Sequence, residues 1–519
     1  MPSITIDGRK LEFAPGQTII QVAHGAGIEV PHYCYHPGLS IAGNCRICMV
    51  EVEKNPKPQI ACYVPATDGM VVHTKSTLAK EAQAGTMEML LVNHPLDCPI
   101  CDQAGECKLQ DYAFEFGNPE TRSPVEKTHQ KKNVPFGANV VYDAERCVKC
   151  TRCVRFTDEV ASTHELSMGS RGDHEEVIMT SKGEFATPYA MNIIDLCPVG
   201  ALTSKDFRFE SRVWFMDFTE SLCTGCARGC NVTIGGRGGR FLRMTPRENE
   251  SVNRWWMCDP GRLGYKHVNS PTRLLVPRVK QGPTLWREAT WDEAITVAAE
   301  ALRAAVKGGV LADAGATLEE LFLLAKATSH LAGDLRFSSR VGADEDGFLI
   351  VNEKGANARG AELLGFSRAT EPASAAIVFV ERGDNVPKAL RDGADAAVVF
   401  ATDAEDVPAG ARVAFPLPSW AERDGLLVNV DGIVQEQKKA RGVGPQHLRS
   451  PVDVLDEIRI EMAIGGASES DGEPFGRSGA VAAIRALPAF GGFVFPTLRS
   501  APPPSKTVAA PAGLAGGGA

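Results

Sequence analysis

The chain has 519 residues, a formal net charge of −9 and an apolar fraction of 44%. This length predicts three or four domains, and the acidic balance argues against nucleic-acid binding, which usually requires a basic face. The sequence has neither a run of 18 apolar residues nor a basic, apolar leader at its N-terminus. We therefore expect no membrane span, and we expect the chain to stay in the compartment where it is made.

The first predicted elements precede a group of four cysteines. Residues 3–13 alternate around an Asp-Gly pair, which predicts a hairpin, and residues 17–25 have a helical pattern. A loop with one Cys-x2-Cys pair and two outlying cysteines is typical of a two-iron cluster. We expect Gly38 and Gly43 to let the backbone of this loop approach the sulfides. The predicted ligands are Cys34, Cys45, Cys48 and Cys62.

Two alternatives remain open for this first set. A structural zinc site would usually contain two Cys-x2-Cys pairs, and this segment contains one. Cys34-Tyr35-His36 matches half of a Rieske motif, but Cys48 stands where the second histidine would be needed. We interpret His36 as an ordinary loop residue.

The second set follows a predicted helix over residues 77–92 and has the spacing His-x3-Cys-x2-Cys-x5-Cys. A lone histidine is more often structural than a ligand, but this one precedes a set that is otherwise one ligand short. A neutral imidazole in place of a thiolate lowers the negative charge on a cluster and favours its reduced form. The predicted four-iron ligands are His94, Cys98, Cys101 and Cys107.

The third set contains the Cys-x2-Cys-x2-Cys run of bacterial ferredoxins, a spacing that zinc rarely uses. Thr157 stands where a two-cluster ferredoxin has its next cysteine, and the expected Cys-Pro pair occurs instead at Cys197-Pro198. This pattern predicts one four-iron cluster that is closed across a long insertion. The predicted ligands are Cys147, Cys150, Cys153 and Cys197.

The fourth set has gaps of 2, 3 and 27 residues, and the long gap contains a predicted hairpin around a glycine turn at residues 235–239. No helix pattern follows these glycines, so a phosphate-binding loop is a weak alternative. The predicted four-iron ligands are Cys223, Cys226, Cys230 and Cys258, which completes the use of all 15 cysteines. In the reducing cytosol such clustered cysteines indicate metal ligands before disulfides.

Two features of the rest of the chain complete the prediction. Apolar runs at residues 376–380 and 396–401 indicate buried parallel strands of an α/β domain. Four basic residues lie inside the cysteine loops, where they either offset cluster charge or form solvated surface: Arg46, Lys149, Arg152 and Arg228.

The order of the four sets resembles one family, the G subunit of bacterial NADH:quinone oxidoreductase (respiratory complex I), which is the bacterial iron–sulfur subunit of the 75-kDa type. All 16 ligands match positions of the family's clusters, the fourth being an off-path cluster that bacterial members often carry. Residues 245–262 and 289–294 are also similar to this family and to the wider molybdopterin oxidoreductase superfamily. Beyond about residue 295 the likeness weakens. A late family pattern is echoed by Glu422, Gly425, Asn429, Gly432 and Gln435, with Ile433 where an arginine is expected.

The resemblance implies a multidomain α+β and α/β fold. Its parts are a β-grasp 2Fe-2S ferredoxin domain (1–76), a His-ligated 4Fe-4S domain (77–117), a ferredoxin-like 4Fe-4S domain (138–212), a molybdopterin-oxidoreductase-type 4Fe-4S domain (216–272), a reduced molybdopterin-oxidoreductase-like α/β domain (273–499) and a disordered tail (500–519).

The resemblance also implies a function: a relay of single electrons from an NADH- and flavin-binding partner subunit toward quinone. It implies one 2Fe-2S and three 4Fe-4S clusters, about 14 iron atoms, with no molybdopterin and no catalytic residue on this chain. The implied partners are the NADH/FMN-binding subunit and other peripheral-arm subunits. The implied location is the cytoplasmic face of the bacterial inner membrane.

Three alternatives are open. The large subunit of an NAD-linked formate dehydrogenase typically has two ferredoxin runs and a cysteine or selenocysteine on molybdenum, whereas this chain has one run and no cysteine after Cys258. The diaphorase-type subunit of an NAD-reducing hydrogenase resembles residues 1 to about 210 and leaves the rest unexplained. A zinc-rich scaffold would be colourless, whereas iron–sulfur sites are brown.

Overall fold

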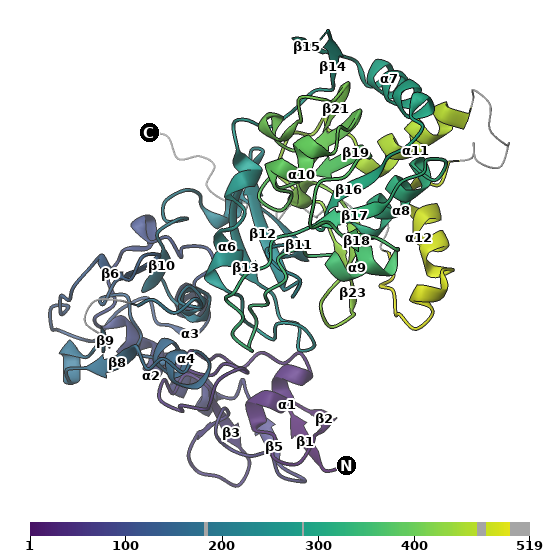
Figure 1. Cartoon of the computed structure of the whole chain (residues 1–519). Coiled ribbons are helices and arrows are strands. Elements are labelled where there is room, and N and C mark those ends of the chain that lie inside the picture. The colour runs from purple at the N-terminus through teal and green to yellow at the C-terminus, as the bar shows by residue number, and fades with distance from the viewer. Residues whose placement is uncertain (181–184, 283–284, 464–473, 499–519) are drawn as a thin grey trace, which may run out of the picture.

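The computed structural model describes residues 1–180, 185–282, 285–463 and 474–498. The predicted tail at 500–519 lies outside these residues. The chain passes from a small N-terminal sheet, through the cysteine-rich middle, to a large α/β layer (Figure 1). No helix in the described ranges is long and apolar enough to cross a membrane.

The N-terminal sheet has the order β2-β1-β5-β3-β4. The predicted hairpin is confirmed as β1 (Ser3–Ile6) and β2 (Arg9–Glu12), joined by Asp7 and Gly8, both with positive φ. The predicted helix is confirmed as α1 (Ile19–Gly25), which buries Ile19 and Ile20 against the sheet. The remaining strands are β3 (Met49–Val52), β4 (Gln59–Ile60) and β5 (Val71–His73).

The middle of the chain is built from short elements that end at cysteine loops. The helix predicted for residues 77–92 is α2 (Thr77–Leu91), whose first turn is capped by the Ser76 hydroxyl accepting from Ala79 N. A three-stranded sheet of order β10-β7-β6 supports the third cysteine set. The elements are α3 (Lys108–Phe116), β6 (Val134–Phe136), β7 (Val140–Tyr142), α4 (Arg152–Glu159), β8 (Leu166–Gly169), β9 (Glu176–Met179), α5 (Asn192–Leu196) and β10 (Leu202–Ser204).

A three-stranded antiparallel sheet carries the fourth set. It comprises β11 (Asp217–Leu222), β12 (Asn231–Arg237) and β13 (Arg240–Pro246), and α6 (Asp259–Leu263) follows it. The predicted glycine hairpin is confirmed, because Gly238 and Gly239 both have positive φ in the turn between β12 and β13.

The C-terminal half is organised around an eight-stranded sheet of order β15-β14-β21-β20-β19-β16-β17-β18. The last six of these strands are parallel, and their order is that of a doubly wound sheet that reverses between β16 and β19. The predicted strands at 376–380 and 396–401 are β19 (Ala375–Val380) and β20 (Val398–Ala401), both buried. The others are β14 (Arg278–Gln281), β15 (Leu285–Glu288), β16 (Gly309–Asp313), β17 (Leu335–Ser338), β18 (Ser367–Arg368) and β21 (Val413–Pro416).

Helices and one hairpin surround this sheet, in teal, green and yellow in Figure 1. Phe379, Phe400 and Phe415 lie side by side on neighbouring strands and form part of the main core. The surrounding elements are α7 (Trp291–Ala304), α8 (Leu318–Ala327), α9 (Ala358–Leu363), α10 (Lys388–Gly393), β22 (Gly425–Val428), β23 (Val434–Gln437), α11 (Pro451–Ala463) and α12 (Gly476–Arg485).

Candidate metal centres

Contacts between neighbouring thiols connect the four cysteines of the first predicted set. Cys34 N donates to Cys45 Sγ at 3.4 Å, and thiol–thiol hydrogen bonds join Cys34 to Cys45 and to Cys62, and Cys48 to Cys62. These bonds lower the pKa values of Cys34 and Cys48 and raise those of Cys45 and Cys62. Residues from three segments of the N-terminal domain therefore place four thiols at one point.

The glycines of the first loop have distinct roles. A Cβ at Gly38 would lie 2.6 Å from Trp255 Cε3 and 2.9 Å from Trp256 Cζ2, so Gly38 leaves room for two indole rings from a distant segment. Gly43 adopts a φ of 61°, a conformation that favours glycine. Gly38 therefore has a packing role that the sequence did not indicate. Its expected role, which is to let the backbone approach a cluster sulfide, stays a prediction.

The second set lies at the start of α3. Cys98 is exposed, whereas Cys101 and Cys107 are buried. Burial raises the pKa of the Cys101 thiol and raises that of Cys107 to about 11, and neighbouring thiols of the set add to both shifts. A Cβ at Gly200 would lie 2.2 Å from Cys101 Sγ, so the loop after Cys197 packs directly on this sulfur.

His94 lies just beyond the end of α2, as predicted. Burial and the nearby cations Lys127 and Arg146 lower its pKa to about 4, so the imidazole is neutral at pH 7, as a metal ligand must be. No hydrogen bond joins His94 to the three cysteines within the described ranges. Its membership of the second set stays a prediction.

The four cysteines of the third set line one cavity, together with Tyr142 and Arg152. Lys149 N donates to Cys147 Sγ at 3.4 Å. Burial raises the pKa of all four thiols, that of Cys150 to about 11. Arg152 is 9% exposed, and its Nε has no hydrogen-bond partner among the described residues.

The four cysteines of the fourth set line a second cavity, of about 180 Å³. Gly225 N donates to Cys223 Sγ at 3.5 Å and Gly261 N to Cys258 Sγ at 3.4 Å. A Cβ at Gly261 would lie 3.1 and 3.2 Å from the sulfurs of Cys258 and Cys223, so the chain is closely fitted around these thiols. Burial raises the pKa of Cys258 to about 11.

Distant residues complete this fourth cavity. Arg340, Lys354 and Arg382 line it from the α/β domain, and sequence reasoning did not identify them because nothing in their local pattern points to a cysteine loop. The late residues Asn429 and Gln435 bond the same loop: Asn429 Nδ2 donates to Arg228 O at 3.4 Å and Gln435 Nε2 to Gly229 O at 3.1 Å.

The sequence left open whether the four basic residues of the cysteine loops offset cluster charge or form solvated surface, and their surroundings differ. Arg46 is exposed, and Arg228 is half-buried and pairs with Asp431 at 2.7 Å. Lys149 Nζ donates to Gln130 Oε1 and to Glu175 O. Arg152 alone of the four is buried against a cysteine cavity.

The donor sets fit iron–sulfur clusters. Buried thiols resist ionisation, and bound iron offsets that cost because the ligand is the thiolate. Backbone N–H groups directed at sulfur are among the features that tune such clusters. Among the described residues, no group of three or more His, Cys, Asp or Glu side chains is arranged to hold a metal ion.

Four protein-family models match successive segments of the chain. They are a 2Fe-2S iron-sulfur cluster binding domain at 2–77, an NADH-ubiquinone oxidoreductase-G iron-sulfur binding region at 83–122, the ferredoxin-like domain of NADH-quinone oxidoreductase subunit 3 at 137–203 and a molybdopterin oxidoreductase Fe4S4 domain at 216–270. Each matched segment contains all four residues of one predicted set.

Curated relatives extend these matches. The G subunit of the NADH-quinone oxidoreductase of Rickettsia bellii is 41% identical over 326 residues, 62% of this chain and 47% of that protein. The corresponding subunit of Streptomyces coelicolor is 37% identical over 400 residues, 76% of this chain and 47% of that protein. The chain belongs to the family of NADH-quinone oxidoreductase G subunits. This member of the family spans about half the length of the curated relatives it matches.

Two further matches are a mitochondrial protein and a hydrogenase chain. A mitochondrial NADH dehydrogenase (ubiquinone) iron-sulfur protein 1 of Solanum tuberosum is 42% identical over 300 residues, 58% of this chain and 40% of that protein. A chain in the crystal structure of an NAD+-reducing NiFe-hydrogenase is 30% identical, with a TM-score of 0.38; the match covers 41% of this chain and 91% of that one.

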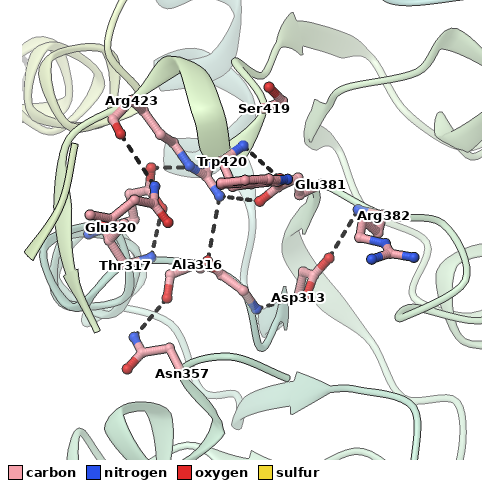
Figure 2. A network of polar contacts seen from close by, with 12 residues as sticks. Asp313, Ala316, Thr317, Glu320, Asn357, Glu381, Arg382, Ser419, Trp420 and Arg423 are labelled. Atoms are coloured by element: carbon pink, nitrogen blue, oxygen red, sulfur yellow. Dashed lines mark hydrogen bonds and ion pairs between the residues drawn. The ribbon is translucent and has the colours of Figure 1, made fainter. Parts of the chain in front are cut away.

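The α/β domain of this G-subunit family member has a second candidate site, at the carboxyl ends of β16 and β19. A doubly wound sheet binds its ligands at this reversal point. Arg423 occupies it, paired with Glu320 at 3.2 Å and in contact with Glu381, which directly follows β19 (Figure 2). Asp313 accepts from Arg382 N at 3.0 Å, and Asp313, Glu381 and Arg423 are each at most 4% exposed. The chain's own side chains therefore fill the place of a ligand.

Proposed function

We propose that this chain is the iron–sulfur electron-relay subunit of an NADH:quinone oxidoreductase. In this proposal it passes single electrons from an NADH- and flavin-binding partner subunit toward quinone, as a peripheral member of a complex at the cytoplasmic face of a bacterial inner membrane. The observation that carries the proposal is the gathering of cysteines from the third and fourth sets around two separate cavities.

The proposed ligands are the sixteen residues of the four sets, which would hold one 2Fe-2S and three 4Fe-4S clusters. When bound, such clusters supply reversible one-electron transfer. The chain's own residues keep most of the sulfurs buried or partly buried and direct N–H groups toward some of them, as Lys149 N and Gly261 N do. Burial and hydrogen bonds to sulfur are two of the means by which a protein sets a cluster's potential.

The α/β domain supports a structural role in preference to molybdenum chemistry. Arg423 and its carboxylate partners fill the crevice where a doubly wound sheet would otherwise receive a cofactor. The same domain closes the fourth cavity with Arg340 and Lys354. These contacts favour a relay subunit over the formate dehydrogenase alternative, whose large subunit would need an open pterin cleft.

Anaerobic metal analysis combined with low-temperature EPR tests the proposal. We expect about 14 iron atoms per chain, one two-iron signal, several four-iron signals and almost no zinc. We also expect no NADH:ferricyanide activity from the pure, flavin-free chain. Zinc near four atoms per chain with little iron would contradict the cluster assignment, and molybdenum near one atom per chain would revive the dehydrogenase alternative.

A further inference from the structure

One helix joins the loops of two cysteine sets. Arg155, on α4, donates from Nη2 to Cys34 O at 2.5 Å and to Cys150 O at 3.3 Å, and from Nη1 to Ser40 O. Cys34 belongs to the first set and Cys150 to the third. A single guanidinium group therefore contacts the backbone of proposed ligands of two different clusters.

A second arginine, about one turn earlier on α4, also contacts the loops of both the first and the third set. Arg152 donates from Nη1 to Leu196 O at 3.0 Å and from Nη2 to Tyr35 O. Leu196 precedes Cys197 of the third set, and Tyr35 follows Cys34 of the first. Residues three apart on a helix lie on the same face, so both guanidinium groups face the same junction between the two loops.

Polar contacts and aromatic rings complete the junction. Asn44 Nδ2 donates to Lys149 O at 3.1 Å, and Ser40 N donates to Glu159 Oε2 at 2.8 Å. The Trp256 ring lies 5.6 Å from His36 and 5.1 Å from Phe156, measured between ring centroids. The first loop is thus held against α4 from the start of the helix to its end.

We propose that Arg152 and Arg155, here called the arginine clamp, are positioning residues that fix the separation between the first and third sets. Arginine suits this role because its rigid fork presents several donors at once and its charge strengthens each bond. Electron tunnelling slows steeply as two redox centres separate, so the clamp would set the rate of transfer between the clusters on either side. This inference rests on the proposed relay function.

The test compares Arg155→Met and Arg155→Lys with wild type in the full-length protein, purified anaerobically. Arg336→Met is the matched control, because Arg336 likewise donates to two backbone carbonyls, Glu371 O and Ala373 O, both at 2.9 Å, within the α/β domain. Iron content and EPR signals report whether both clusters are present. The magnetic interaction between the two-iron and third-set signals reports their separation, and rapid-freeze EPR after photoreduction reports the transfer rate.

We expect Arg155→Met to keep its iron and both signals, to weaken the magnetic interaction and to slow transfer severalfold. Arg155→Lys should lie between Arg155→Met and wild type, since one ammonium cannot span the same carbonyls, and Arg336→Met should match wild type. An unchanged interaction and rate in Arg155→Met would overturn the clamp, as would loss of a cluster from both Arg155 variants, which would assign the residue to cluster binding. A wild-type protein without these two signals would instead contradict the proposed function.

Discussion

At the scale of single residues, close packing rather than backbone conformation explains why position 38 is occupied by glycine. Its backbone does not adopt a positive φ, but the ring atoms of Trp255 and Trp256 lie within 3 Å of the position a Cβ would take. The two tryptophans directly precede Met257 and Cys258, so the loop of the first set packs against the segment that supplies the last predicted ligand of the fourth.

We expect Gly38→Ala to lower the free energy of unfolding by about 1–3 kcal/mol, because an added methyl group must displace the indole rings of Trp255 and Trp256. Gly85→Ala is the control. Gly85 lies inside α2 with nothing within 4 Å of the added Cβ, so alanine there should raise the free energy of unfolding by about 0.5–1 kcal/mol through its higher helix propensity. Urea unfolding of the two variants should therefore show shifts of opposite sign; a stabilised Gly38→Ala would refute the packing argument.

At the scale of elements, the ends of β16 and β19 hold a charged network where a ligand would bind. Glu381 accepts from Trp420 N at 2.6 Å and contacts Arg423 (Figure 2). Burial raises the pKa of the Glu381 carboxyl from 4.5 to about 7, although Arg423 opposes the shift. The native protein therefore keeps a proton on Glu381 that the unfolded chain releases above pH 4.5.

This difference in proton binding predicts that the contribution of Glu381 to the free energy of unfolding falls as pH rises from 4.5 to about 7 and then levels. Glu381→Gln removes the titrating group, so the fall over this range should become shallower by at most about 3 kcal/mol. Glu300→Gln, at an exposed position on α7, should keep the wild-type profile. Chemical denaturation at a series of pH values is the measurement, and identical profiles for wild type and Glu381→Gln would disprove the assignment.

At the scale of the whole molecule, the half of the chain without cysteines closes a site of the cysteine-rich half. Arg340 and Lys354 line the fourth cavity, and Gln435 bonds the loop between Cys226 and Cys230. The α/β domain is therefore positioned to shield the fourth set from solvent and oxygen.

We expect Gln435→Leu to shorten the lifetime of the fourth-set four-iron signal in air and to leave the two-iron signal unchanged, because it leaves Gly229 O without its donor. Gln437→Leu is the matched control. Gln437 lies two residues further along β23, is also buried, and donates to Arg423 O at 3.2 Å inside the α/β domain. EPR during air exposure distinguishes the two variants, and equal decay of the fourth-set signal would argue against the shielding role.

Local spacing determined the hairpin at residues 3–13, the helix before His94 and the buried strands of the α/β domain, because these patterns extend over a few residues to about fifteen. The grouping of the cysteines into four ligand sets, the membership of His94 and the cluster count stay predictions. Contacts between distant segments were decided only by tertiary structure: Arg155 reaches Cys34 O from 121 positions away, and Arg423 fills the crevice beside Glu381. Such contacts depend on how helices and strands that are distant in the sequence pack against one another, and no local pattern in the sequence predicts that packing.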